Sequence, residues 1–217
     1  MSASDWGQVE QNISLRLGRL LEPQGYTWLP RLHQFRREEP TGFRCIILAL
    51  SPVPEGALLE LHLGIRLQLV EQMAFPYTNG LQGFMPDSMT LAFPLSRLFG
   101  KPFQRFDVPF EGLPEAVFRV LEQQLSAQGL PFLERHSSVA ALHGLFNAQP
   151  TAPLHLVHNQ VNRCLRGLAL AHLHDRAQLS RLIAAYRQSL EEQYFAPPSA
   201  LEKFERLSAF LLNYQPN

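Results

Sequence analysis

The spacing of apolar residues divides the chain into two halves with different expected secondary structure. Up to about residue 110, apolar and polar positions alternate or form short apolar runs, and after that point apolar residues recur every three or four positions. Strands followed by helices are typical of α+β proteins. We therefore predict an N-terminal helix packed on an antiparallel sheet of four to five strands (1–110). A helical region (111–217) follows, which either shares the core of the sheet or folds separately.

The first segments fit a helix and two strands. Residues 5–22 carry apolar side chains at helical spacing, and Asp5 with Gln8 has the form of a capping pair. Residues 26–37 are expected to form one edge strand, because Pro30 lacks the N–H that a central ladder requires. The next run, FRCIILALS, is almost continuously apolar, which is typical of a central strand covered on both faces.

The clearest alternation lies in the sequence LLELHLGIRLQL, which predicts a half-buried strand. Its apolar face is formed by Leu59, Leu61, Leu63, Ile65, Leu67 and Leu69. Glu60, His62 and Arg66 lie on the opposite face, and Gln68 follows them. An ionisable row on a sheet face either pairs across strands or meets a ligand. We therefore take Glu60, His62 and Arg66 as candidate partner-binding residues.

The segment FPYTNGLQGFMPD at 75–87 is expected to be a loop, because it contains an Asn–Gly pair, a further glycine and two prolines. Loops of this length are often functional or mobile. Tyr77 and Phe84 are apolar side chains in this loop, and we add them to the candidate partner-binding residues. The alternative is that Phe75 and Phe84 are buried beneath the sheet.

Two short strands and a series of helices are expected in the rest of the chain. Segments 89–95 and 101–110 fit the strands. The expected helices are one between Pro114 and Gly129, one from Ser138 to Phe146, a long one that begins at Pro153, one capped by Asp175 with Gln178, and one that begins at a capping box of Ser199 with Glu202.

The stretch HLVHNQVNRCLRGLALAHLHD at 155–175 contains four histidines, which raises the question of a metal site. On a helix, Cys164 and His172 fall on the buried stripe, His158 lies at its edge and His155 lies on the polar side. His158 and His172 would be separated by about 21 Å and could not share one metal ion. Only His155 and His158 are neighbours, and two more ligands would have to come from elsewhere. We therefore assign no metal ligand.

The same part of the chain has no acidic residue between Glu134 and Asp175. This acid-free stretch contains His136, His143, His155, His158, His172 and His174 together with Arg135, Arg163 and Arg166. Protonation of histidines below about pH 6.5 would add positive charge to it. An acidic partner and a pH response therefore stay open beside ordinary histidine packing.

Composition and charge argue against several classes of partner. The 19 basic and 19 acidic side chains balance, so no global field favours nucleic acid or an anionic membrane. No apolar run approaches the roughly 20 residues of a membrane span, and the N-terminus lacks the basic-then-apolar order of a signal peptide. Cys45 and Cys164 belong to no paired spacing, which suits reduced thiols. We expect a cytoplasmic protein.

Motifs for catalysis or cofactor binding are absent from the sequence. The pair Gly100–Lys101 is followed by proline, where the helix of a phosphate-binding loop would begin. There is no serine elbow and no HExxH motif. We therefore assign no catalytic residue and no cofactor.

Three segments, LLEPQGYTWLPRLHQFRREEPTGFRCIILALS, LELHLGIRLQLVEQM and GLPFLERHSSVAALHGLF, carry a resemblance to a broad set of uncharacterised bacterial proteins of about this length. Such proteins combine an N-terminal helix, a GY or GF phrase, a basic edge strand, a GIR strand and a helical C-terminal half. Some proteins of this layout resemble cytoplasmic immunity proteins, which bind and block a toxin. The resemblance implies no catalytic residue in this chain.

These observations favour a non-enzymatic cytoplasmic protein-binding module, immunity-like or regulatory. Its partner would meet the sheet face around Glu60, His62 and Arg66 and the loop around Tyr77 and Phe84. One alternative is a metal-dependent hydrolase that uses the C-terminal histidines, above all His155 and His158. A second alternative is a helical scaffold, formed by residues 130–217, that docks an amphipathic peptide. The sequence specifies neither the partner nor the oligomeric state.

Overall fold

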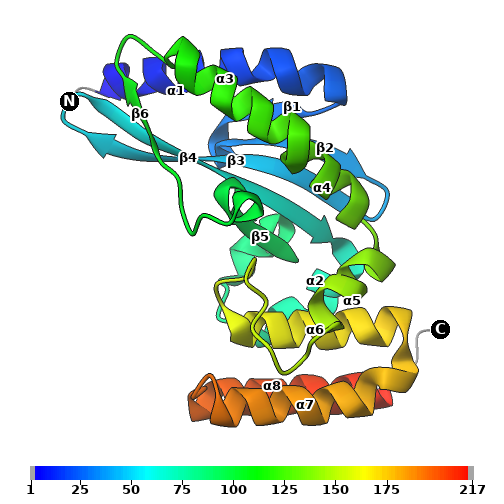
Figure 1. The fold of residues 1–217 in the computed structure, drawn as a ribbon. Coiled ribbons are helices and arrows are strands. Elements are labelled where there is room, and N and C mark those ends of the chain that lie inside the picture. The colour runs from blue at the N-terminus through cyan, green and yellow to red at the C-terminus, as the bar shows by residue number, and fades with distance from the viewer. Residues whose placement is uncertain (1–2, 215–217) are drawn as a thin grey trace. The chain divides into compact units, whose positions relative to one another are not determined.

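The structure confirms the expected α+β class (Figure 1). The computed structural model describes the backbone of residues 3–214 and the side chains of residues 7–214. The Asp5 side chain of the expected capping pair with Gln8 lies outside the described residues. The helices are α1 (Ala3–Leu21), α2 (Gln68–Ala74), α3 (Glu115–Gln124), α4 (Leu130–His136), α5 (Val139–Asn147), α6 (Gln160–His174), α7 (Leu179–Glu192) and α8 (Pro198–Asn213). The strands are β1 (Thr27–Leu29), β2 (Gln34–Glu39), β3 (Gly42–Val53), β4 (Gly56–Leu67), β5 (Leu91–Pro94) and β6 (Phe106–Pro109).

The sheet has the order β1-β2-β3-β4-β5, and β6 pairs with β4 as a sixth strand. The pairs β1–β2, β2–β3 and β4–β6 are antiparallel, with Phe35 opposite Ile46 and Ala57 opposite Val108. The apolar run FRCIILALS lies in β3, between β2 and β4, and was correctly predicted as a central strand. Its neighbour β4 carries the alternating leucines.

The chain groups into two compact units that are not consecutive in sequence. Met1–Ile65 with Ala92–Arg135 forms one, called here the sheet unit, and Arg66–Leu91 with His136–Asn217 forms the other, called the helical unit. The segment between β4 and β5 therefore groups with the C-terminal helices. The expected boundary near residue 110 stays a prediction.

The core of the sheet unit forms between α1 and the apolar sides of the strands. Val9, Ile13, Leu17 and Leu21 are buried on one face of α1, which contacts β1 and α3. Phe93 of β5 packs edge to face against Phe132 of α4, with ring centroids 5.1 Å apart.

Residues 26–37 form two strands, so the prediction of one edge strand was wrong in part. Pro30–Leu32 form a short 3-10 turn between β1 and β2, and His33 has a left-handed φ of 48°. Pro30 interrupts the ladder because it has no N–H to donate. The resulting β1 is the edge of the sheet, as expected.

The helix after Pro114 does not end before Gly129, contrary to the sequence expectation. A π-helical turn (Leu125–Gly129) continues α3 directly into α4. Gly129 is buried, and a Cβ at this position would lie 3.1 Å from Leu95 Cδ1. Glycine therefore allows close packing inside the helix at this position, instead of ending it.

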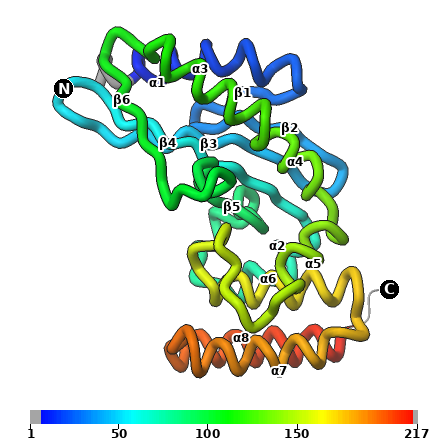
Figure 2. Tube along the Cα trace, in the orientation of Figure 1, coloured from blue at the N-terminus to red at the C-terminus, as the bar shows by residue number. Residues whose placement is uncertain are grey.

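The helical unit is built around α6, which contacts α2, α5, α7 and α8. Figure 2 shows α7 and α8 running side by side below it. Cys164 and His172 are buried on α6, as the sequence predicted. Among the described residues, no helix has both the length and the apolar character to cross a membrane.

Two helix starts in this unit differ from the sequence expectation. The helix expected from Pro153 begins at Gln160, because Asn159 caps it through a bond from Asn162 N, and the Gln160 side chain bonds the backbone of Leu154 and Val157. The expected capping box of Ser199 with Glu202 is absent. α8 begins at Pro198, whose fixed φ suits a first helical turn.

Gly56→Ala tests the close approach of β4 and β6. A Cβ at Gly56, where φ is +152°, would lie 2.1 Å from Val108 O, so we expect the free energy of unfolding to fall by about 3 kcal/mol or more. Urea denaturation measures it. The control is Gly100→Ala, at φ +70° with no atom within 4 Å, which should cost about 1 kcal/mol. A similar loss of unfolding free energy in both variants would contradict the idea that Gly56 is required by its close contact with β6.

Candidate functional site

The ionisable row on β4 is half-buried at Glu60 and His62. Glu60 Oε2 lies 3.3 Å from His62 Nε2, and Glu60 Oε1 is buried without a hydrogen-bond partner. Both residues belong to the sheet unit, whereas Arg66, Tyr77 and Phe84 belong to the helical unit. The two side chains of β4 thus pair with each other, and the row that was expected to continue to Arg66 ends at His62.

Arg66 is not on an exposed sheet face, which corrects the sequence expectation. Only 3% of this residue is exposed. The strand ends at Leu67, and Gln68 and Leu69 lie in α2, where Leu69 is exposed to solvent. The period of two therefore ends two residues earlier than the leucine pattern suggested.

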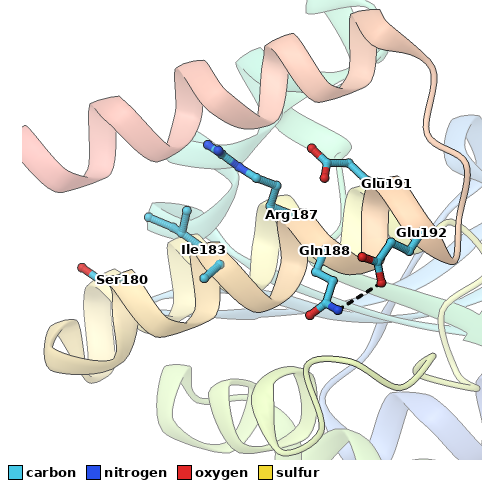
Figure 3. A pocket seen from close by; sticks show the side chains of 7 residues that line it. Ser180, Ile183, Arg187, Gln188, Glu191 and Glu192 are labelled. Carbon is cyan, nitrogen blue, oxygen red and sulfur yellow. Dashed lines mark hydrogen bonds between the residues drawn. The ribbon is translucent and has the colours of Figure 1, made fainter.

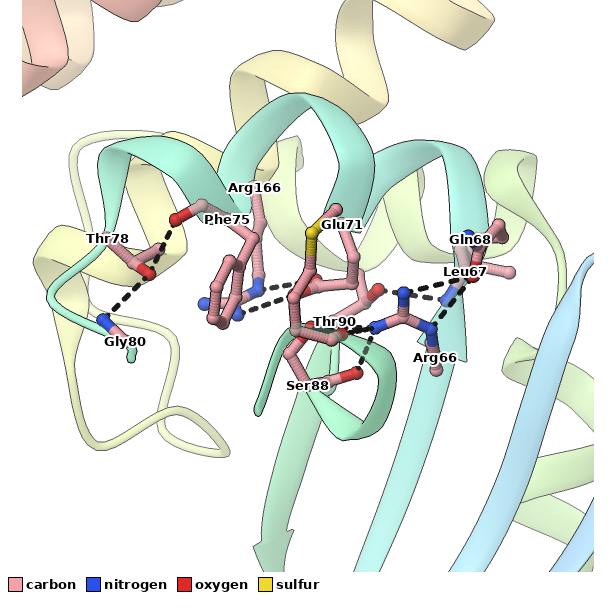
Figure 4. Close-up of polar contacts among 11 residues, drawn as sticks. Arg66, Leu67, Gln68, Glu71, Phe75, Thr78, Gly80, Ser88, Thr90 and Arg166 are labelled. Atoms are coloured by element: carbon pink, nitrogen blue, oxygen red, sulfur yellow. Dashed lines mark hydrogen bonds and ion pairs between the residues drawn. The ribbon is translucent and has the colours of Figure 1, made fainter. Parts of the chain in front are cut away.

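The Arg66 guanidinium is bonded through all three nitrogens (Figure 4). Nη1 donates to Met85 O at 2.8 Å, and to Ser88 O and Ser88 Oγ at 2.7 Å each. Nε and Nη2 donate to Gln68 Oε1 at 3.1 and 3.0 Å. A buried cation needs such acceptors because it has lost its water. The backbone of the 85–88 segment is therefore fixed against the end of β4.

A second buried charge, Glu71 on α2, pairs with Arg166 on α6. The ion pair is bidentate, with Nε–Oε1 at 2.8 Å and Nη2–Oε2 at 2.9 Å. Burial alone would raise the pKa of the Glu71 carboxyl, but Arg166 and hydrogen bonds from Ser88 and Thr90 outweigh it and hold the pKa below its usual value. The carboxylate thus joins α2, α6 and the segment before β5.

The 78–88 loop, defined here as residues 78–88, is held at both ends. Lys203 of α8 donates to Thr78 O at 3.2 Å and to Asn79 Oδ1 at 2.5 Å. Arg66 binds the other end, as described above. Between these anchors Leu81 and Phe84 are 70% and 64% exposed. The loop therefore presents two large apolar side chains to solvent from a fixed backbone.

The remaining aromatic residues of this region pack against the protein. Phe75 is buried, and a Cβ at Gly80 would lie 2.7 Å from its ring, whereas Phe84 is exposed. The expected burial of both rings is therefore wrong for Phe84. Tyr77 is half-buried, and its ring centroid is 6.4 Å from that of Phe210 on α8. Of the two loop candidates, Phe84 is the more exposed.

The sequence did not single out Glu71 or Lys203, and it placed Arg166 in the acid-free stretch and not in an ion pair. The acid in LQLVEQM, between apolar neighbours on a short helix, is the signal that could have identified Glu71. Its partner is 95 residues away, and nothing in the sequence pairs the two.

The histidines of the C-terminal half do not assemble a metal site among the described residues, where no group of three potential ligands occurs. His155 and His158 are exposed and precede α6. The prediction that they are neighbours on a helix was therefore wrong. Burial raises the pKa of the Cys164 thiol to about 12, which disfavours the reactive thiolate.

The acid-free stretch does not form an exposed basic surface at its two central arginines. Arg166 pairs with Glu71, and buried Arg163 donates to the carbonyls of Phe146 at 2.7 Å and Gln149 at 2.9 Å. Both guanidinium groups are therefore bonded inside the helical unit and are not displayed to an acidic partner.

Comparison with known proteins gave no relative. No protein-family model matches this chain, and no curated protein and no solved structure matches it significantly.

Arg66→Met should release the end of the 78–88 loop. The carbonyls of Met85 and Ser88 lose their donor, so we expect the free energy of unfolding to fall by about 2–4 kcal/mol. Amides of residues 81–88 should exchange hydrogen faster, which mass spectrometry measures. Lys203→Met is the control and should cost about 1 kcal/mol, with faster exchange near Thr78. Equal effects of the two variants would contradict the role of Arg66.

Acidification should destabilise the protein through two buried histidines. Burial lowers the pKa of His143, with a further contribution from His174, and burial also lowers that of His172, with a contribution from Arg176. The unfolded chain therefore binds more protons, and stability falls as the pH drops through about 6.5 toward the lowered folded values.

Urea denaturation at pH 7.5 and at about pH 5.5 measures this loss. His172→Leu should reduce it, because the substitution removes one of the two imidazoles whose pKa is lowered by burial. A variant that loses as much stability as the native chain over this range would show that His172 is not responsible.

Proposed function

We propose that this protein is a non-enzymatic protein-binding module whose partner docks on Leu81 and Phe84 of the 78–88 loop. The observation that carries the proposal is the contrast between a backbone fixed by buried Arg66 and the exposure of these two side chains. Large apolar side chains gain free energy when a partner removes them from water. A loop already ordered in the free protein also loses less entropy on binding.

The biological role that we propose for the module, immunity-like or regulatory, rests on the resemblance of its sequence to immunity-type proteins. Cytoplasmic immunity-type proteins bind and block a toxin. A regulatory binding protein would use the same surface. The half-buried Glu60–His62 pair on β4, in the sheet unit, would offer a partner at most one polar contact. Arg66 acts from inside, by positioning the loop.

The alternative of a metal-dependent hydrolase has no support from the geometry. It needed a ligand set around His155 and His158, and the described residues contain no such group. We therefore propose no hydrolase activity.

Replacement of both loop side chains tests the proposal. A photoreactive amino acid at exposed Gln82 should crosslink one dominant protein in an extract of the source cells. Leu81→Ser with Phe84→Ser should reduce that crosslink at least about tenfold, because such anchors dominate interface energies. The stability of this double variant should change by less than about 0.5 kcal/mol, since both side chains are exposed.

The matched control is Leu15→Ser with Phe103→Ser, which removes two similarly exposed apolar side chains from the sheet unit. It should leave the crosslink unchanged. An unchanged crosslink in the loop variant, or no captured protein at micromolar concentration, would refute the proposal.

A further inference from the structure

One face of α7 carries a shallow, open surface groove of about 420 Å³, whose lining residues all belong to this helix (Figure 3). Its lining residues are Ser180, Ile183, Ala184, Arg187, Gln188, Glu191 and Glu192. They recur every three or four positions, so they form one stripe of the helix. The stripe from Ser180 to Glu192 is about 18 Å long, which is about three turns of a second helix lying against it.

The groove has an apolar part and an acidic part. Ile183 and Ala184 supply the apolar part, and Glu191 and Glu192 lie at the C-terminal end of α7. Arg187 is the one cation of the lining, and its charge is matched by an ion pair with Glu205 on α8. Two carboxylates therefore remain, and they give this end of the groove a negative charge.

Phe195 follows the acidic end of the groove and is 81% exposed. It has a left-handed φ of 46°, in a turn closed by Ala196 N to Leu190 O at 2.9 Å and Tyr194 N to Ser189 O at 3.0 Å. Glycine is the usual residue at this position of a helix end, because a side chain there is strained. Phe195 is thus an aromatic residue at a position where its exposure to water and its left-handed φ are both unfavourable.

We propose that the α7 groove and Phe195 bind a cationic amphipathic helix of a partner protein. Its apolar stripe would cover Ile183 and Ala184, its lysines or arginines would meet Glu191 and Glu192, and Phe195 would insert beside them. Charge complementarity selects this occupant, because the same carboxylates repel nucleic acid and anionic lipid. The inference rests on the proposed role as a binding module, and it adds a contact surface other than the 78–88 loop.

A synthetic helix provides the probe for the charge complementarity. The peptide has about 14 residues, with leucine at helical spacing and lysine elsewhere, and its binding is followed by fluorescence anisotropy. We expect saturable binding that weakens with added salt. Glu191→Gln with Glu192→Gln should weaken it about tenfold. Glu55→Gln, an exposed acid in the turn between β3 and β4, is the control and should bind as the native chain does.

The same peptide with glutamate in place of lysine should not bind. Equal binding of both peptides, or no loss in the Glu191–Glu192 variant, would overturn the proposal. Leu81→Ser with Phe84→Ser should keep peptide binding. Loss of peptide binding in this loop variant, with retention in the α7 variant, would place the peptide on the 78–88 loop and refute the groove while leaving the proposed function intact.

Substitution of Phe195 separates a binding role from a structural one. Phe195→Gly should raise the folding equilibrium constant about two- to fivefold, because glycine adopts this φ without strain, and should lower peptide affinity at least about tenfold. Phe195→Ala keeps the strained backbone and should lose affinity without that gain. Lower stability in Phe195→Gly, or unchanged peptide affinity in both variants, would contradict the assignment.

Discussion

The order of the 78–88 loop depends on one buried cation, Arg66. A guanidinium inside a protein has lost its water and must find acceptors, and here the carbonyls of Met85 and Ser88 supply them. The need to satisfy this charge therefore helps to set the conformation of the loop, together with Lys203 at its other end and the backbone bonds from Phe84 N to Leu81 O and from Ser88 N to Met85 O. Arg163 fixes the segment after α5 in the same way, through carbonyls of Phe146 and Gln149.

This constraint has a consequence for binding. A loop held by buried hydrogen bonds retains its shape when Leu81 and Phe84 are surrounded by water, so a partner meets a surface that is already formed. Phe195 is presented in a comparable way, by the backbone bonds that close the end of α7. In both places the protein fixes the backbone first and leaves aromatic or aliphatic side chains exposed, which is typical of surfaces that serve recognition.

The fold could be predicted from sequence where periodicity is long and uninterrupted. The alternation through β4 and the helical spacing in α1, α6 and α7 identified these elements, because burial on one face imposes a period. Where the apolar periodicity gave a wrong prediction, polar side chains determine the local structure. Arg66 continues the alternation but is buried by a returning loop, and Asn159 with Gln160 delays the start of α6. The Glu71–Arg166 pair joins residues far apart in sequence, which no local pattern can encode.

The central claim is that the 78–88 loop is ordered in the free protein although Leu81 and Phe84 are exposed. Backbone ¹⁵N relaxation of the isolated chain in solution measures this directly at the amides of residues 81–84. If Arg66 and Lys203 hold the loop as the structure indicates, the order parameters should be about 0.85, as in the flanking helices. Values below about 0.6 would show a flexible segment and contradict a preformed binding surface.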